Sequence, residues 1–137
     1  DPECQTIMPL MDNNFVILLQ KCAQGTLTGN EIIKMSEKFS GCVIATSNGY
    51  PHNYEIGFPI NFGNIDSEDC QIFDSGTSLN SDGQLVTDGG RVLSVVCQGK
   101  DFDKVFEKAY QNLKEITFEG IYYRNDIGYQ VRKETKK

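Results

Sequence analysis

The stretch that decides the fold is TDGGRVLSVV at residues 87–96. Gly89 and Gly90 leave the backbone free to turn or to approach a neighbour closely. The apolar and β-branched run after Arg91 predicts a largely buried strand. An arginine at the mouth of a buried strand, beside bare backbone N–H groups, is one arrangement that holds an anion. Taken alone, the ten residues favour a tight turn with a solvated arginine, so the rest of the chain has to decide.

The composition is that of one globular domain. A chain of 137 residues can bury a single core, and 39% hydrophobic and 23% charged residues are ordinary for a folded protein. The net charge of −6 argues against a nucleic-acid partner. No apolar run approaches the roughly 20 residues that a membrane-spanning helix needs, so no membrane partner is expected.

Five cysteines, at positions 4, 22, 42, 70 and 97, are an odd number and match no zinc spacing. Most lie in apolar runs, which predicts small core residues. We expect reduced thiols in a cytoplasmic protein. Basic residues gather only from Arg132 to Lys137, which predicts a solvated terminus or linker.

The N-terminal segment predicts a broken pair of apolar helices. Asp1-Pro2-Glu3 is a helix-start signal without a preceding methionine, which indicates a processed protein or a fragment of a longer one. Pro9 interrupts the first helix, and Asn13-Asn14 can cap a second that ends at Gly25. Apolar helices need a surface, so we expect this pair to pack onto residues 39–129 or onto another copy of the chain.

From position 42 the pattern changes to short strands separated by Gly, Pro and Asn turns. Apolar runs predict strands at 42–46, 71–73 and 91–97, and an edge strand at 56–62 that a glycine and a proline interrupt. Ser81-Asp82-Gly83 predicts a hairpin turn. Strands at such short spacing indicate a small sandwich or barrel.

The clearest helix begins after Asp101, which is placed to cap it. Its apolar residues repeat at helical spacing and predict one buried face. After it, residues 121–129 predict an extended aromatic segment, with Arg124 and Asp126 forming a structural ion pair. The predicted buried face of the helix comprises Phe102, Val105, Phe106, Ala109, Tyr110, Leu113 and Ile116.

The sequence IFDSGTS at 72–78 matches the aspartic-protease signature. Two such loops facing each other let two carboxylates share a proton and activate water. One alternative function is therefore a homodimeric aspartic protease built on the Asp74-Ser75-Gly76-Thr77 loop. The long helix and the opening helices fit that fold poorly, and Asp-Ser-Gly is ordinary turn chemistry.

No other residue type predicts catalysis or a metal site. His52 is the only histidine, and its place in a turn after Pro51 predicts a solvated side chain. The acidic residues are scattered without the spacing of a catalytic pair, and no phosphate-binding P-loop occurs. The residues themselves thus predict an α+β domain with one suggestive Gly-Gly-Arg loop. A non-enzymatic β-rich interaction module is the second alternative.

Four motifs occur in order along nearly the whole chain: DPECQ at 1–5, SNGYP at 47–51, Gly76-Thr77 followed by TDGGRVL at 87–93, and EGIYYRNDIGY at 119–129. Together they resemble the C-terminal part of the glycinamide ribonucleotide synthetase family, the phosphoribosylamine–glycine ligases. Four ordered motifs are far more specific than a single Asp-Ser-Gly-Thr.

The resemblance implies an enzyme that joins glycine to phosphoribosylamine in purine synthesis, using ATP and magnesium through a glycyl phosphate intermediate. It also implies that the metal ligands precede Asp1, so the chain alone is expected to be inactive and to bind neither cofactor. Two positions depart from the family pattern. Asp74-Ser75 replaces the usual His-Ala, and Ile56 replaces the usual Lys. A carboxylate at position 74 would repel a phosphate.

The resemblance divides the chain into residues 1–28, the helical tail of an ATP-grasp domain, and residues 29–137, the ligase C-terminal domain. The predicted fold class is α+β: a small barrel-sandwich-like antiparallel β domain with one long flanking helix. Its implied partners are the two substrates and the missing N-terminal and ATP-grasp domains. Self-association through residues 1–25 is a further expectation.

The resemblance also selects the candidate site. Gly89, Gly90 and Arg91 are predicted to bind the phosphate of phosphoribosylamine, and the loop of Gly49 and Tyr50 to shape the wall beside it. The chain would then close the substrate cleft, and no catalytic residue would lie within it.

Overall fold

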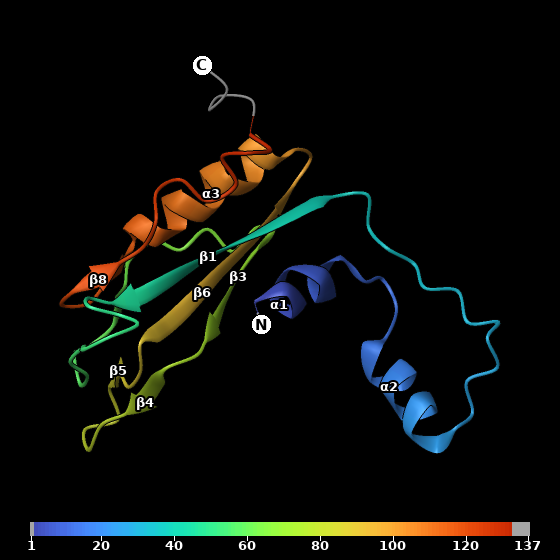
Figure 1. The fold of residues 1–137 in the computed structure, drawn as a ribbon, viewed down its shortest axis with the longest axis horizontal. Coiled ribbons are helices and arrows are strands. Elements are labelled where there is room, and N and C mark those ends of the chain that lie inside the picture. The colour runs from blue at the N-terminus through green and yellow to red at the C-terminus, as the bar shows by residue number, and fades with distance from the viewer. Residues whose placement is uncertain (1, 133–137) are drawn as a thin grey trace.

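A four-stranded antiparallel sheet in the order β3-β6-β1-β8 forms the centre of the computed structural model, which describes residues 2–132 (Figure 1). One long helix, α3 (Phe102–Lys114), flanks the sheet, and a helical tail precedes it. The predicted α+β class, an antiparallel β domain with one long flanking helix, is confirmed. The strands of the sheet are β1 (Phe39–Ser47), β3 (Cys70–Asp74), β6 (Arg91–Gly99) and β8 (Ile121–Tyr122).

Strand β6 is an inner strand of the sheet, between β3 and β1. Every residue from Val92 to Cys97 is buried, because β1 and β3 pair on its two edges while helices cover both faces. Val95 lies opposite Val43 of β1 and Ile72 of β3. The strand predicted at 91–97 is therefore confirmed, and it continues to Gly99.

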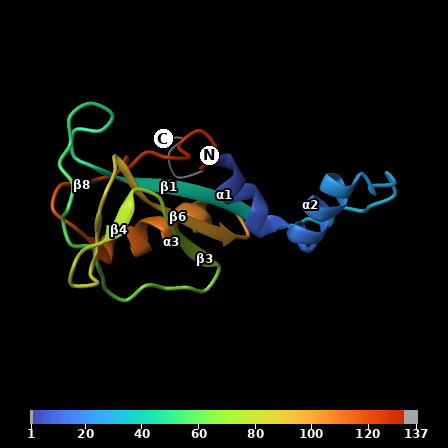
Figure 2. The same cartoon turned by 90° about the horizontal axis from the view of Figure 1, so that it is seen from below.

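The two faces of the sheet carry different helices (Figures 1 and 2). Strand β1 alternates: Val43 and Ala45 are buried in the core cluster with α3, whereas Cys42 and Ile44 are half-buried on the face toward α1 (Glu3–Ile7). At Gly41 an added Cβ would lie 2.8 Å from Val105 Cγ1, so this glycine lets α3 approach β1.

Helix α3 follows the predicted pattern closely. The Asp101 side chain caps it by accepting a hydrogen bond of 2.8 Å from the Lys104 N–H. The helix ends at Lys114, so Ile116, predicted as its last apolar residue, lies instead in β7 (Ile116–Thr117). Ile116 is still only 2% exposed.

Two small antiparallel ribbons complete the β structure. The predicted hairpin is confirmed as β4 (Thr77–Leu79) and β5 (Leu85–Thr87), with the Asn80 side chain accepting the amides of the turn. The second ribbon pairs β2 (Asn61–Phe62) with β7.

The edge strand predicted at 56–62 is wrong over most of its length, since only Asn61–Phe62 is a strand. Gly57 has a positive φ of 91°, and Pro59 has no N–H to donate to a ladder. The segment nevertheless runs beside β5, with the Gly57 N–H 2.6 Å from the Thr87 carbonyl oxygen.

The N-terminal helices break where predicted. Helix α1 passes into the 3₁₀ turn η1 (Met8–Leu10) at Pro9, and α2 (Phe15–Gln24) begins after Asn14, whose side chain caps it. Gly25 ends α2 with a φ of 65°. The predicted cap at Asp1 and the basic residues after Arg132 lie outside the described residues.

Only one of the two helices packs as predicted. Helix α1 lies on β1 and β6, and η1 is fixed there by the Gln98 side-chain amide, which donates to the Pro9 carbonyl at 3.1 Å. Helix α2 projects away from the sheet and has no buried residue (Figures 1 and 2). The expectation that α2 packs onto residues 39–129 is therefore wrong. Packing onto another copy stays a prediction.

The expectation of reduced thiols is also wrong for one pair. Cys70 and Cys97 face each other across β3 and β6 with their Cα atoms 4.1 Å apart, and a disulfide joins them. They are 27 residues apart in sequence, so only the register of the two strands brings them together. Cys4, Cys22 and Cys42 are free.

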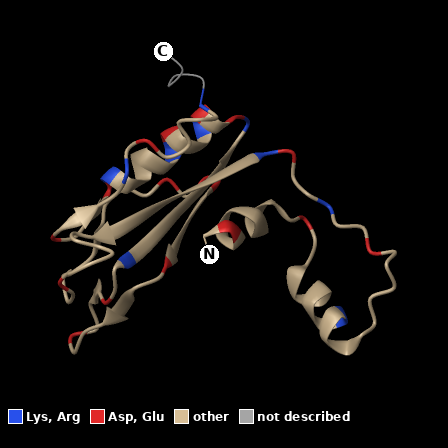
Figure 3. Ribbon diagram, in the orientation of Figure 1, with Lys and Arg blue, Asp and Glu red and all other residues tan. Residues whose placement is uncertain are grey.

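Acidic and basic residues are interspersed along the described helices, strands and loops (Figure 3). Within residues 2–132, no helix combines the length and apolar character needed to cross a bilayer.

Candidate functional site

An open cavity of about 480 Å³ lies where four segments of the chain meet. Helix α1, the loop after β1, the β3–β4 connection and the start of β6 all contribute to its wall. Three of the five predicted site residues, Tyr50, Gly90 and Arg91, line it. The remaining lining residues are Gln5, Ser75 and Gly76.

The glycines of the cavity are required by close backbone packing. A Cβ added to Gly76 would lie 2.6 Å from Gly89 Cα and 2.7 Å from the Arg91 carbonyl oxygen. A Cβ on Gly90 would lie 2.1 Å from the Tyr50 ring. Neither position has room for a side chain, so the backbone at Gly76 packs against the backbone of Gly89 and Arg91, and the Tyr50 ring packs against Gly90.

Ser47, at the end of β1, orients the glycine pair. Its N–H donates to the Gly90 carbonyl at 2.8 Å, and its hydroxyl donates to the Gly89 carbonyl at 2.9 Å. In the trans peptide between Gly89 and Gly90, the N–H points opposite to the carbonyl. Because the Gly89 carbonyl faces the Ser47 hydroxyl, the Gly90 N–H points away from Ser47. No pattern in the sequence predicts this role for Ser47.

Gly49 supports the cavity without lining it. Its φ is 92°, and an added Cβ would lie 2.0 Å from the Asn53 carbonyl oxygen. The loop is closed by the His52 N–H, which donates to the Gly49 carbonyl at 2.9 Å, and the Tyr50–Pro51 peptide is cis. This loop holds the Tyr50 ring against Gly90. His52 is exposed, as predicted.

The cavity is suited to an anion. Arg91 brings a full positive charge and Gln5 and Ser75 bring neutral polar groups, while the lining drawn from residues 2–132 includes no acidic side chain. Asp74, the last residue of β3, is exposed and is not among the lining residues. The prediction from sequence did not include Gln5 and Ser75 among the site residues, although both lie in motifs noted above.

The Asp-Ser-Gly-Thr loop belongs to this cavity. The Ser75 N–H donates to the Val92 carbonyl at 3.0 Å and the Gly76 N–H to the Arg91 carbonyl at 2.7 Å. These bonds attach the loop to β6 and turn Ser75 and Gly76 toward Arg91. The arrangement favours a wall of an anion site over one half of a protease dyad.

A second cavity, of about 460 Å³ and largely apolar, shares Tyr50 and Arg91 with the first. Cys42 lies in its wall, and burial raises the pKa of the thiol to about 11, with only partial compensation by Ser94. The thiol is therefore protonated at neutral pH and is a poor nucleophile. Across residues 2–132, no group of three or more His, Cys, Asp or Glu residues is placed to hold a metal ion.

Arg124 and Asp126 form the ion pair that the sequence predicted. Arg124 Nη2 lies 2.7 Å from Asp126 Oδ2, and Arg124 Nε lies 2.9 Å from Oδ1. The hydrogen bonds from Arg124 lower the pKa of Asp126, even though both side chains are largely exposed.

Comparisons with known proteins identify the family of the chain. The family model described as "Phosphoribosylglycinamide synthetase, C domain" matches residues 40–130. A phosphoribosylamine–glycine ligase of Nostoc is 42% identical over 132 residues, which cover 96% of this chain and 31% of the relative. A bifunctional purine biosynthetic protein of Dictyostelium discoideum is 38% identical over 133 residues and is covered to 16%.

A solved structure is similar as well. The crystal structure of a phosphoribosylamine–glycine ligase from Thermotoga maritima matches with a TM-score of 0.77 at 32% identity, over 92% of this chain and 30% of that one. The chain thus spans about a third of the length of the single-function ligases that it matches.

Proposed function

The chain belongs to the phosphoribosylglycinamide synthetase C-domain family, and from this premise we propose that it is the C-terminal part of a ligase joining glycine to phosphoribosylamine. The first part of this proposal is one of architecture. Residues 1–28 are the end of an ATP-grasp domain and residues 29–137 form the C-terminal domain. The apolar face of α2 then packs on the remainder of that ligase, with self-association as its alternative.

The chemistry of the cavity supports a role in substrate binding. A phosphate is a compact dianion, and the Arg91 guanidinium offers it several donors beside the neutral polar side chains of Gln5 and Ser75. In this proposal Gly89 and Gly90 let the backbone approach the phosphate of phosphoribosylamine, while Gly49 and Tyr50 shape the wall. The convergence of Arg91, Gly90 and Tyr50 on one cavity, beside the polar side chains of Gln5 and Ser75, is the observation that carries the proposal.

We assign ATP and Mg²⁺ to the part of the ligase outside this chain. Among residues 2–132, no group of three or more His, Cys, Asp or Glu residues is placed to hold a metal ion. The activating groups lie in that other part of the ligase too, and the chain alone is inactive. We further propose a cytoplasmic enzyme of purine synthesis.

A chimera tests the proposal. The matching 132 residues of the Nostoc ligase are replaced by this chain, and ADP release is measured with ATP, glycine and phosphoribosylamine. We expect activity, and in Arg91→Ala a rise of about tenfold or more in the KM for phosphoribosylamine, since a hydrogen bond to a charged group contributes roughly 1.5–3 kcal/mol.

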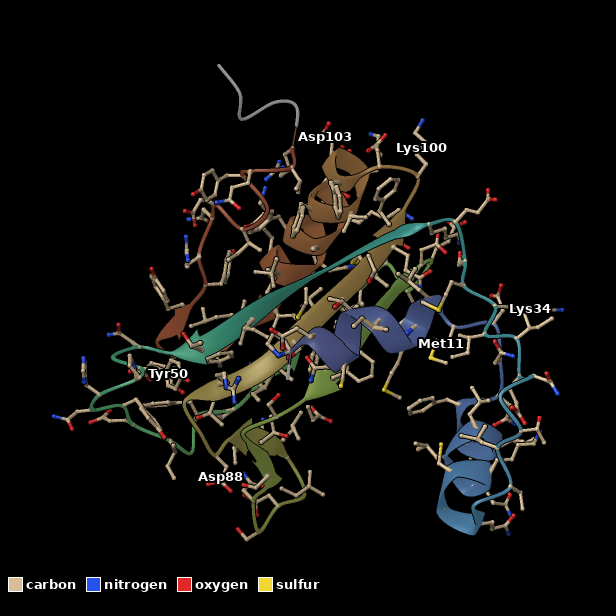
Figure 4. The ribbon with its side chains drawn as sticks, turned by 45° about the vertical axis from the view of Figure 1, so that its right-hand side comes forward. Met11, Lys34, Tyr50, Asp88, Lys100 and Asp103 are labelled. Carbon is tan, nitrogen blue, oxygen red and sulfur yellow. A yellow bond between two sulfur atoms is a disulfide. The ribbon has the colours of Figure 1, made fainter. Side chains whose placement is uncertain are left out.

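The matched control is Lys100→Ala, which also removes one positive charge and lies at the far end of β6 from Tyr50 (Figure 4). It should leave the KM unchanged. Unaltered KM and turnover in Arg91→Ala would refute the phosphate role. A folded chimera without activity would refute the ligase assignment. Peptide cleavage by the chain that Asp74→Asn abolishes would instead support the protease.

A further inference from the structure

Helix α1 contributes one polar side chain, that of Gln5, to the anion cavity. Resting on the proposed function, we propose that Gln5 is a substrate-binding residue whose side-chain amide donates a hydrogen bond to the phosphate held by Arg91. The cavity is then a composite site, built from both of the domains proposed above.

The position of Gln5 is fixed by the packing of α1. The helix lies across β6 and β1 (Figure 4), and the contact between Gln98 and Pro9 holds the 3₁₀ turn that follows it. Gln5 is half-buried, whereas its neighbours Glu3 and Cys4 are exposed. The helix therefore directs Gln5, and not those neighbours, toward the sheet and the cavity.

Cys42 determines which end of the amide faces the cavity. The Cys42 thiol donates to Gln5 Oε1 across 3.9 Å. Its raised pKa of about 11 keeps the proton on sulfur at neutral pH, so sulfur is the donor and the amide oxygen the acceptor. With Oε1 turned to Cys42, the Nε2 group is the branch of the amide that remains for the cavity.

The donor is matched to the ligand proposed for this cavity. Arg91 provides the charge, and an amide N–H adds a directional bond to a phosphate oxygen without a second charge to desolvate. A carboxylate in the same place would do the opposite, because two anions at hydrogen-bond distance repel each other. Gln5→Glu is thus close to isosteric but reverses the interaction.

The test measures binding of ribose 5-phosphate to the 137-residue chain by isothermal titration calorimetry and by amide shifts in NMR spectra. We expect the Kd to rise about tenfold or more in Gln5→Glu and about three- to tenfold in Gln5→Ala, in line with one hydrogen bond. The matched control is Gln20→Glu on α2, which makes the same charge change on an exposed helix far from the cavity. It should bind as the unaltered chain does.

A third variant separates binding from packing. Gln5→Glu could displace α1, which would shift the backbone amide signals next to Pro9 and in β6. Gln5→Met avoids the added charge, because it keeps the length of the side chain and replaces the whole amide, both the donor and the oxygen that accepts from Cys42. It should again weaken binding about three- to tenfold. Cys42→Ala leaves the amide in place but removes its orienting partner, so it should broaden or shift the Gln5 side-chain NH₂ signals.

The outcomes distinguish this inference from the function on which it rests. Loss of binding in Arg91→Ala with unchanged binding in Gln5→Glu and Gln5→Met overturns the role of Gln5 and leaves the phosphate site intact. If the unaltered chain binds neither ribose 5-phosphate nor inorganic phosphate, the phosphate site itself is refuted, and Gln5 falls with it. Weakened binding in Gln5→Glu and Gln5→Met, with an unaffected Gln20→Glu, supports the inference.

Discussion

Helix α2 is more apolar than α3, yet α2 is exposed and α3 is buried along one face. Helix α2 has the sequence FVILLQKCAQ and no buried residue, whereas α3, with FDKVFEKAYQNLK, buries five. The reason lies in the partner surface. Helix α3 covers β1 and β6, while α2 projects into solvent (Figure 1). Apolar content shows that a helix needs a partner, but it does not show where that partner is.

The N-terminal segment exposes apolar side chains both on α2 and in the chain that follows it. Val16 is 71% exposed and Ile32 is 76% exposed. Large exposed apolar surfaces are unusual on single soluble domains and mark places where another surface packs. The chain spans about a third of its single-function relatives, and under the proposed function the remaining two thirds of the ligase contact this segment.

The largest expected difference between the two regions comes from a pair of leucines. Leu93→Ala, in the centre of the sheet at 0% exposure, should lower the free energy of unfolding by about 3 kcal/mol because it leaves a cavity. Leu19→Ala, on α2 at 51% exposure, should change it by less than about 0.5 kcal/mol. Urea denaturation measures both. Equal losses would show that α2 packs on the core after all.

Local chemistry explains which parts of the fold could be predicted. Asp101, Asn14 and Gly25 act at their own helix ends, and the sequence identified all three. The strand at 91–97 was predictable because nearly every residue in it is apolar. The strand predicted at 56–62 does not form over most of its length, because Gly57 has a positive φ and Pro59 has no N–H for a ladder hydrogen bond.

Long-range register explains what could not be predicted. The pairing of Cys70 with Cys97 depends on how β3 aligns with β6, and the contact of Gln5 with the cavity depends on where α1 docks. The sequence named Tyr50, Gly90 and Arg91 through ordered motifs. It could not show that Ser75 joins them, because the Asp-Ser-Gly-Thr loop had a competing interpretation as a protease motif.

Two asparagines, Asn112 on α3 and Asn14 before α2, should give the next largest difference in the loss of stability between the two regions. Asn112 is 2% exposed, and its side chain both accepts from the Asp66 N–H at 2.8 Å and donates to the Asp66 carbonyl at 3.0 Å. Asn112→Ala leaves both groups unsatisfied and should destabilise the fold by about 2 kcal/mol.

Asn14→Ala removes the cap of α2, whose Oδ1 accepts from the Ile17 N–H at 3.3 Å. It should reduce the helicity of α2 by the equivalent of about 1 kcal/mol, yet leave the unfolding of the core unchanged. Circular dichroism and urea denaturation separate the two effects. A fall in global stability with Asn14→Ala that matches the fall with Asn112→Ala would mean that the two regions unfold as one unit.

The smallest effect is confined to the end of α2 and depends on pH. Glu31 accepts from the amides of Thr28 and Gly29 at 3.1 and 3.0 Å and lies 3.2 Å from Lys21 Nζ. Desolvation opposes its charge, but hydrogen bonds from its own backbone and from Thr28, together with Lys21, lower the pKa of Glu31 to about 2.

The direction of the pH effect follows from that lowered pKa. A carboxyl that titrates below its ordinary value of 4.5 stabilises the folded loop fully above about pH 4.5 and loses that contribution as the pH falls through about 2. The Thr28 and Gly29 amide shifts should therefore hold to about pH 3 and then move together, while the amide of Val95 in β6 stays fixed. In Glu31→Gln the two loop amides should no longer titrate. If Glu31 titrates at its ordinary value instead, the loop is not closed in solution, and the segment around α2 is less ordered than the sheet at every pH.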